Sequence, residues 1–275
     1  MESKDTRTQA PDEHGEWRKS RWEEVAGPEG KANLVAFHLI TEPNQAVPGI
    51  PGVWNSSGVP DGLTLSASLE DGLSFDKNAI DSFDRNAVDG SVRLRSDDRV
   101  SLADGRWLTI GVLASTYSVY VWDPAASTRA RLRDIAAYPW DPQWVVAAEY
   151  RQQDSELVRA VARARSVSPL GEDVSPIPGA FAFTLHGERH RLLAFEPVPG
   201  ILLVVFRDGT SGTETPSIGR WLILPTPETG PVRLDFNRAM LPHHVFAESF
   251  PCPLPPQENH LPLRVEAGER VPLRD

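Results

Sequence analysis

The sequence predicts a mainly β protein with sandwich- or barrel-like sheets, a short N-terminal helix and a long irregular Pro-rich C-terminal segment. Two observations support this fold class. The chain contains 25 Pro and 20 Gly among 275 residues, and helices tolerate such punctuation poorly. Apolar and polar residues also alternate in short runs separated by Asp-Gly pairs, which is typical of strands joined by tight turns.

The predicted helix lies near the N-terminus. Residues 1–15 are polar and charged without periodicity, which predicts a disordered lead-in. Glu16 to Val25 (EWRKSRWEEV) has the pattern of a short amphipathic helix, and the pair Gly27-Pro28 ends it.

The segment from Leu63 to Asp123 alternates with the period of strands. Its turn signals, Asp71-Gly72, Asp89-Gly90 and Asp104-Gly105, recur at the spacing of one strand plus one turn. This pattern is expected of a sandwich or a barrel. The alternating residues are Leu63, Leu65, Ala67, Val92, Leu94, Val100, Leu102, Trp107, Thr109, Gly111, Leu113, Val119 and Val121.

Further strands are predicted in the second half of the chain, and Asp154 to Arg165 fits a helix or a strand equally well. After Asn237 the chain is rich in Pro and irregular until Leu263 to Val265, and a long irregular segment is either functional or held by many contacts. We divide the chain into residues 1–15, an N-terminal β part (16–150) and a C-terminal β part (151–275). The predicted strands are a hairpin over Phe181 to Phe195, a buried strand over Ile201 to Phe206, and strands over Arg220 to Leu224 and Val232 to Phe236.

Composition limits the classes of partner. The formal net charge of −10 and the pI of about 5.2 argue against a nucleic-acid partner, which would need a basic face. The N-terminus lacks the apolar stretch of a secretory signal. The longest apolar run, Ile201 to Phe206, is too short to cross a membrane. We therefore expect a cytoplasmic protein without a membrane partner, and leave its oligomeric state open.

The last third of the chain carries a distinctive series of motifs. Asp208 is followed by T-S-G-T-E-T, then come Gly219-Arg220, D-F-N-R-A (235–239), C-P-L-P-P-Q-E-N-H-L-P (252–262) and A-G-E (267–269). This series resembles the signature of the DUF1684 family, with weaker matches at Trp17-Arg18 and at Y-P-W-D-P (138–142). The resemblance implies a mostly β fold with an N-terminal sandwich, and implies no particular activity.

The chain departs from that family pattern in two places. His244 stands where relatives have a Cys after Pro-Pro, within Pro242-His243-His244. Relatives also tend to carry arginines in the strand around 114–122, where this chain has A-S-T-Y-S-V-Y-V-W. An anion bound through those arginines would therefore not be bound there by this chain.

The loop from Asp208 to Arg220 is one candidate site. With Ser211, Glu214 and Arg220 it offers hydroxyls, an acid and a guanidinium that suit a carboxylate or phosphate ligand. The structural alternative is a turn in which Asp208 caps Gly209 and an ion pair between Glu214 and Arg220 holds two strands together. Both interpretations stay open.

Histidines of the irregular segment are the second group of candidates. His243 or His244 would suit acid–base catalysis, because the ordinary pKa of histidine, about 6.5, lies near working pH. With Cys252 and His260 they also supply the ligand types that zinc prefers, although the spacing matches no known motif. We predict no cofactor and no firm metal site, with zinc as an alternative.

Residues near the end of the last predicted strand complete the candidate site. Asp235 and Asn237 flank Phe236 and share one face of a strand, where they would orient a substrate or a histidine; alternatively, Asn237 caps the following segment. Trp221 would line an apolar ligand cavity or fill the core.

Three functions remain open at this stage. The first is a cofactor-independent lyase, cyclase or isomerase that acts on a small apolar metabolite. His243, His244, Asp235 and Glu214 would be its catalytic residues, and its binding residues would be Arg220, Ser211, Asn237, Trp221 and His260. The others are a non-catalytic ligand-binding protein and a metal-dependent hydrolase. No nucleotide-binding, serine-hydrolase or zincin motif is present.

Overall fold

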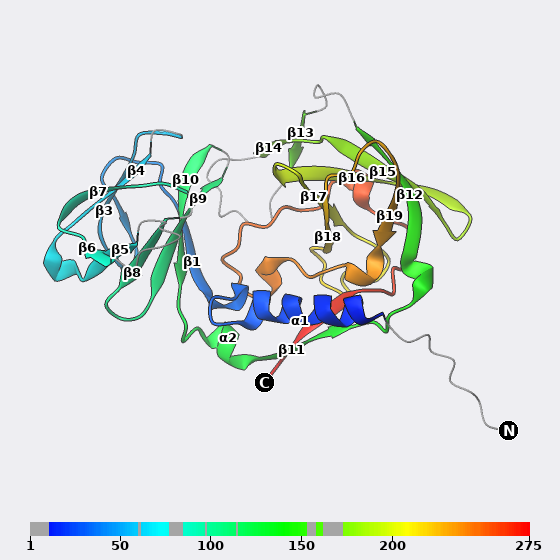
Figure 1. The fold of residues 1–275 in the computed structure, drawn as a ribbon, viewed down its shortest axis with the longest axis horizontal. Coiled ribbons are helices and arrows are strands. Elements are labelled where there is room, and N and C mark those ends of the chain that lie inside the picture. Colours follow the sequence, from blue (N-terminus) through cyan, green and yellow to red (C-terminus); the bar gives the residue numbers. More distant parts are fainter. Residues whose placement is uncertain are drawn as a thin grey trace. The chain divides into compact units, whose positions relative to one another are not determined.

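The computed structural model describes residues 11–59, 62–76, 85–96, 98–113, 115–152, 158–161 and 173–275. The chain forms two compact units, which we call the sandwich unit and the barrel unit (Figure 1). The sandwich unit holds Ala26–Ala130 and Ala247–Phe250, and the barrel unit holds the described residues from 11 to 25, Arg131–Phe246 and Pro251–Asp275. No helix of the described ranges is long and apolar enough to cross a membrane.

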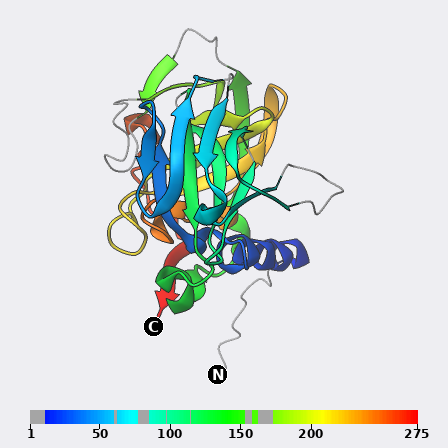
Figure 2. The same ribbon diagram turned by 90° about the vertical axis from the view of Figure 1, so that its left-hand side faces the viewer.

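The sandwich unit consists of two antiparallel sheets around one core. One sheet has the strand order β1-β10-β9-β8-β5-β6 and the other β2-β3-β4-β7. Alternate residues of both sheets, among them Trp54, Leu65, Val100 and Val119, are buried in that core. Figure 2 shows these strands in blue, cyan and green. They are β1 (Leu34–Leu39), β2 (Gln45–Val47), β3 (Ile50–Ser56), β4 (Leu63–Ala67), β5 (Leu73–Asp76), β6 (Arg85–Ala87), β7 (Gly90–Leu94), β8 (Arg99–Leu102), β9 (Trp107–Leu113) and β10 (Thr116–Trp122).

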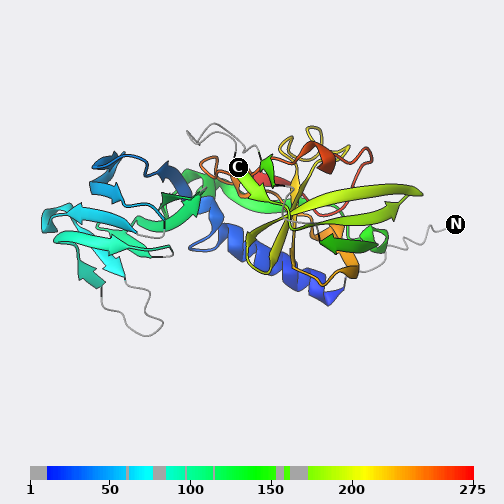
Figure 3. The same ribbon diagram turned by 90° about the horizontal axis from the view of Figure 1, so that it is seen from above.

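The barrel unit contains a six-stranded antiparallel sheet in the order β18-β17-β16-β15-β12-β19. Figure 3 shows its long β15–β16 hairpin in yellow-green. Beside this sheet the unit has two strand pairs, β11–β20 and β13–β14. The strands are β11 (Leu132–Ala137), β12 (Val145–Gln152), β13 (Val158–Val161), β14 (Asp173–Pro176), β15 (Gly179–Leu185), β16 (Glu188–Val198), β17 (Ile201–Phe206), β18 (Arg220–Pro225), β19 (Gly230–Asp235) and β20 (Glu269–Arg274).

The six-stranded sheet is curled into an incomplete barrel. β18 and β19 are its two edge strands, yet only residues 226–229 connect them. In a flat sheet of six strands the edges would lie about 24 Å apart, whereas this connection spans at most roughly 18 Å. The sheet must therefore curl until β18 and β19 face each other across a gap. Phe181, Leu192, Val204 and Phe206 are among the side chains that fill its interior.

Short helices complete the fold. α1 (Asp12–Ala26) lies against the β11–β20 pair, since Arg18 donates to the Ile135 carbonyl at 2.8 Å and Arg21 pairs with Glu269. The remaining short helices are η1 (Lys31–Asn33), η2 (Leu69–Asp71), α2 (Ser127–Arg131), η3 (Pro142–Trp144), η4 (Phe236–Arg238), η5 (His243–Val245) and η6 (Gln257–Asn259).

The structure confirms the fold class and most of the predicted strands. The hairpin, the strand at Ile201–Phe206 and the irregular segment after Asn237 all form as expected, and the described part of the ambiguous segment, Val158–Val161, is a strand. The helix starts at Asp12 rather than Glu16, because Asp12 and Glu13 suit the positive end of the helix dipole. Residues 1–10 of the predicted lead-in lie outside the described residues.

Two boundaries lie elsewhere than the sequence indicates. The irregular segment continues past Val265 and β20 begins only at Glu269, because side chains bond the main-chain groups of Val265: Asp208 accepts from its N–H and Arg220 donates to its carbonyl. The predicted division between residues 150 and 151 falls inside β12, whereas the barrel unit resumes at Arg131. All of β12 thus belongs to the unit that carries the motifs of the last third.

Candidate functional site

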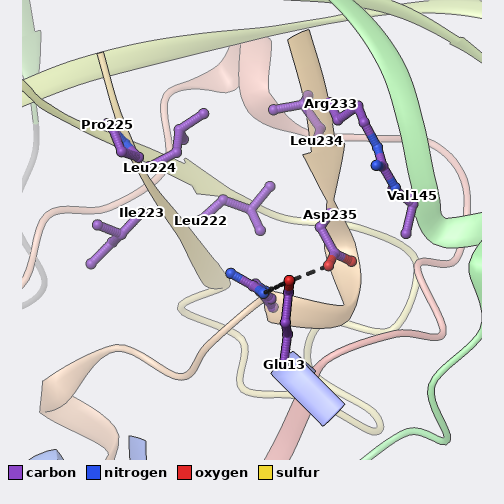
Figure 4. A pocket seen from close by; sticks show the side chains of 10 residues that line it. Glu13, Val145, Leu222, Ile223, Leu224, Pro225, Arg233, Leu234 and Asp235 are labelled. Carbon is purple, nitrogen blue, oxygen red and sulfur yellow. Dashed lines mark ion pairs between the residues drawn. The ribbon is translucent and has the colours of Figure 1, made fainter. Parts of the chain in front are cut away.

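A pocket of about 310 Å³ lies in the gap between β18 and β19 (Figure 4). The connection 226–229 bounds the gap at one end. At the other end the main chains of Trp221 and Met240 bond each other, N–H to carbonyl in both directions at 2.9 Å. Met240 therefore closes the barrel locally, and the pocket occupies the stretch that no strand fills.

Aliphatic side chains form most of the pocket wall. Leu222 and Leu234 are almost fully buried and point inward from the facing strands β18 and β19, and Ile223 is 48% exposed. A wall of this kind favours an apolar ligand body, because burying such a surface removes it from water. The apolar residues lining the pocket are Val145, Leu222, Ile223, Leu224, Pro225 and Leu234.

Charged side chains stand at the rim. Arg238 of η4 lies 3.7 Å from the Glu13 carboxylate of α1 and 3.6 Å from that of Asp235 (Figure 4). Asp235 Oδ1 also accepts hydrogen bonds from the main-chain N–H and the side-chain amide of Asn237, at 3.0 and 2.9 Å. The fourth charged residue, Arg233, is exposed on β19.

His14 lies close to this rim on α1. Burial lowers the pKa of His14 below its ordinary value, while the nearby carboxylate of Asp235 opposes that shift. Its Nδ1 is buried and has no hydrogen-bond partner in the described part of the chain. The rim thus holds carboxylates, guanidinium groups and one imidazole whose lowered pKa favours its neutral form.

Of the residues predicted for the site, Asp235 lines the pocket and two others stand next to it. Asn237 is buried, where its amide donates to the Asp141 carbonyl at 2.9 Å and its Oδ1 accepts from the Asp141 N–H at 3.0 Å. Trp221 is 5% exposed and precedes the lining residue Leu222. Asn237 therefore positions Asp235, and the acid–base role of Asp235 stays a prediction.

Arg220 and Ser211 belong to a buried network instead. Arg220 is fully buried, pairs with Asp208 at 3.4 Å and donates to the carbonyls of Val265, Ala267 and Glu269. Asp208 accepts from the Ser211 hydroxyl at 3.2 Å. The predicted ion pair between Glu214 and Arg220 is wrong, because Asp208 lies closer to this guanidinium within the loop.

Glu214 sits at the surface among other partners. It accepts from the Tyr138 hydroxyl at 2.9 Å, and it pairs with Arg264 and, at 3.4 Å, with Arg270. The hydrogen bonds from Tyr138 and Arg264 hold the pKa of Glu214 below its ordinary value. The carboxylate is therefore a poor proton acceptor, and its contacts join the 207–219 loop to β20.

The predicted histidines lie apart from the pocket lining. The ring of His243 packs edge-on to Trp221 with the ring centroids 5.1 Å apart, and its Nε2 lies 3.1 Å from Glu24 Oε1. The main-chain N–H of His244 contacts the buried Cys252 sulfur at 3.3 Å. The main chain of His260 forms an isolated β-bridge with Arg207, and burial lowers the pKa of the His260 imidazole. The described residues contain no group of three or more His, Cys, Asp or Glu placed to hold a metal ion.

Replacing His243 with Asn is expected to raise the pKa of Glu24. Burial raises this pKa, but the hydrogen bond to His243 and the charge of Arg21 outweigh burial and bring it to about 2. Because the pKa of Glu24 is depressed in the folded state, its contribution to stability is present at pH values above the ordinary pKa of glutamate and is lost as the pH falls toward 2. The variant should therefore lose less stability over that range.

Carboxyl-detected NMR titration of Glu24 measures this shift directly. His186→Asn is a suitable control, because His186 sits in a hairpin turn with φ of 51°, a conformation that Asn tolerates. An unchanged Glu24 pKa in the His243 variant would contradict the assigned contact.

Residues 130–270, more than half of the chain, match the family model described as "Protein of unknown function (DUF1684)". The chain belongs to the DUF1684 family. A solved structure, the NMR structure of an uncharacterised protein from gene locus rrnAC0354 of Haloarcula marismortui, is 29% identical over 50% of this chain and 77% of that chain. Its TM-score of 0.42 is too low to establish a shared arrangement. A search of curated proteins finds no significant match.

The DUF1684 motifs largely occupy structural positions. Gly219 of the G-R pair has φ of +88°, and a Cβ there would lie 2.3 Å from the Phe206 carbonyl oxygen. Asn259 of the E-N pair is buried; its amide donates to the Leu193 and Val205 carbonyls, and its Oδ1 accepts from the Leu193 N–H. These residues hold the irregular segment against the barrel.

Three charged residues that line the pocket were missed at the level of sequence. Arg238 lies inside the D-F-N-R-A motif, and Arg233 shares one face of the predicted strand with Asp235. Arg233 was accessible from the alternation of β19. Arg238 was accessible only from its place in that motif, because it belongs to η4. Glu13 was not, because only the earlier start of α1 brings it to the rim.

Proposed function

We propose that this DUF1684 protein binds a small molecule in the pocket between β18 and β19. The observation that carries the proposal is an aliphatic pocket in the open seam of an otherwise filled barrel, with charged groups at one end. Its volume of about 310 Å³ lies at the lower end of the range for ligand pockets. A pocket of this size suits a small ligand.

The shape of the seam favours a small molecule over an added peptide strand. Main-chain groups point out of a strand edge at every second residue, so the β18 groups available after Trp221 are those of Ile223 and Pro225. The main-chain groups of Trp221 already bond those of Met240, and Pro225 has no N–H to donate. On the β18 edge, a single described residue with a free donor is too little for strand addition, which depends on repeated main-chain hydrogen bonds.

The histidine-based catalysis expected from sequence has less support from this geometry. His243 and His244 do not line the pocket, whereas Asp235 does. Ligand binding is therefore the function we propose, and chemistry on the bound molecule would depend on Asp235.

Titration with 1-octanol tests the proposal. We expect saturable binding, detected as methyl NMR shifts of pocket residues, and at least tenfold weaker binding by Ile223→Trp, whose indole would fill the seam. Ile223 is suitable for this change because it is 48% exposed, so a larger side chain need not disturb the core.

Val198→Trp is the matched control. Val198 is an exposed aliphatic residue at the end of β16 in the same sheet, and it does not line the pocket. Equal weakening by the two variants would refute binding at the seam, as would the absence of saturable binding up to the solubility limit of octanol.

A further inference from the structure

The charges at the pocket rim differ in how far they are already neutralised. Arg238 lies between Glu13 and Asp235, and both separations exceed 3.5 Å, so these are ion pairs without hydrogen bonds. Asp235 also accepts hydrogen bonds from the main-chain N–H and the side-chain amide of Asn237. Each of these three groups therefore has a partner of opposite charge within the protein.

Arg233 is different. In the described part of the chain its guanidinium makes no ion pair and no side-chain hydrogen bond, although it lines the pocket. It lies two residues before Asp235, so both side chains leave the same face of β19, about 7 Å apart along the strand. A cation in this position offers a planar fork of donors to a carboxylate at the pocket mouth.

Two buried arginines of the barrel unit, in contrast, have partners within the protein. Arg220 binds three carbonyls and Asp208, and Arg21 binds Glu269 and the Leu241 carbonyl. Both are structural and inaccessible. Arg233 combines exposure, lack of a partner and a place beside an aliphatic wall, which neither of them does.

We infer that the ligand of this pocket is an amphipathic carboxylate, bound through its anionic group to Arg233 and through its apolar body to Leu222, Leu224 and Leu234. The inference rests on the proposed function and names its ligand class. A pocket at the lower end of the size range for ligands suits a short chain, and a carboxylate of about eight carbons is a suitable probe.

Three probes of equal chain length separate the contributions: octanoate, 1-octanol and octylamine, at neutral pH and low ionic strength. We expect octanoate to bind roughly tenfold more tightly than octanol, since hydrogen bonds to charged groups contribute more than neutral ones. Octylamine should bind no better than octanol, because Glu13 and Asp235 already share Arg238.

Arg233→Gln should abolish the advantage of octanoate over octanol. Arg191→Gln is the matched control, since Arg191 is an exposed arginine of β16 in the same sheet that does not line the pocket. It should keep the full advantage. Calorimetry or methyl NMR gives the dissociation constants.

The outcomes distinguish this inference from the proposed function. Equal binding of octanoate and octanol, tightest binding of octylamine, or an octanoate advantage that survives Arg233→Gln would overturn the ligand class while leaving a pocket that binds apolar molecules. Failure of all three probes to bind would overturn the proposed function, and the ligand class with it.

Discussion

Arg220→Gln should lower the free energy of unfolding of the barrel unit by about 3–5 kcal/mol. The guanidinium is fully buried between β18 and the irregular segment, where it pairs with Asp208 at 3.4 Å. Removing its charge leaves the Asp208 carboxylate buried without a cation, which costs more than the ion pair itself contributes. Burial lowers the pKa of Arg220 and the charge of Asp208 opposes this, as expected for a pair that depends on mutual compensation.

The loss should be large because Arg220 also satisfies three main-chain carbonyls. Val265, Ala267 and Glu269 lie in the irregular stretch before β20 and at its first residue, and their carbonyls accept from this one side chain. Glutamine is shorter and donates from one amide only, so at least one buried carbonyl would stay unpaired, at about 1–3 kcal/mol.

Urea denaturation, followed by methyl NMR signals of the barrel core, measures the change in that unit alone. Arg264→Gln is the matched control: Arg264 pairs with Glu214 and Glu266, but its side chain is 45% exposed, so the variant should lose far less stability than Arg220→Gln. Equal stabilities of the two variants would mean that Arg220 is not the structural residue its burial indicates.

The same residue shows what sequence patterns can and cannot predict here. The strand that Arg220 begins follows from the alternation of its apolar residues, because side-chain period is a local property. The ion-pair partner of Arg220 cannot be predicted in this way. Glu214 and Asp208 both lie in the preceding loop, and only the tertiary path of the chain decides that Asp208 faces inward while Glu214 meets Arg264 and Arg270 at the surface.

The pocket was unpredictable from sequence for a related reason. Predicting β18 and β19 as strands is straightforward, but consecutive strands pair with each other in most antiparallel sheets. Here they form opposite edges, and the seam between them exists only because four strands separate them in the sheet. The histidines attracted attention by residue type alone, whereas Arg233 and Arg238 matter through the position of their strand and turn.

Glu269→Gln should destabilise the barrel unit by about 3 kcal/mol and release α1 first. Glu269 pairs with Arg21 of α1, with Nε–Oε1 at 3.1 Å and both side chains 1% exposed. Its Oε2 also accepts from the Leu241 N–H at 2.6 Å. The neutral amide would leave the Arg21 charge buried, with Glu24 at 3.0 Å as its remaining ion-pair partner among the described residues, so we expect the lower end of the range for a broken buried pair.

Hydrogen exchange of the α1 amides is the most direct measurement, because these contacts join the helix to β20 and to Leu241. Protection in α1 should fall further than protection in β17, which lies inside the barrel sheet. Glu266→Gln makes the same chemical change three residues earlier, at a side chain 54% exposed that pairs with Arg264; it should leave α1 protection within about 0.5 kcal/mol of the wild type. If both variants exchange alike, the pair does not anchor α1.

Gly268 of the same A-G-E motif contributes in a different way. Its φ is +74°, and a Cβ there would lie 2.4 Å from the Ala239 carbonyl oxygen, which accepts from the Glu269 N–H at 2.7 Å. Loss of the charge pair should therefore free α1, whereas a side chain introduced at Gly268 would first loosen the contact between β20 and Ala239.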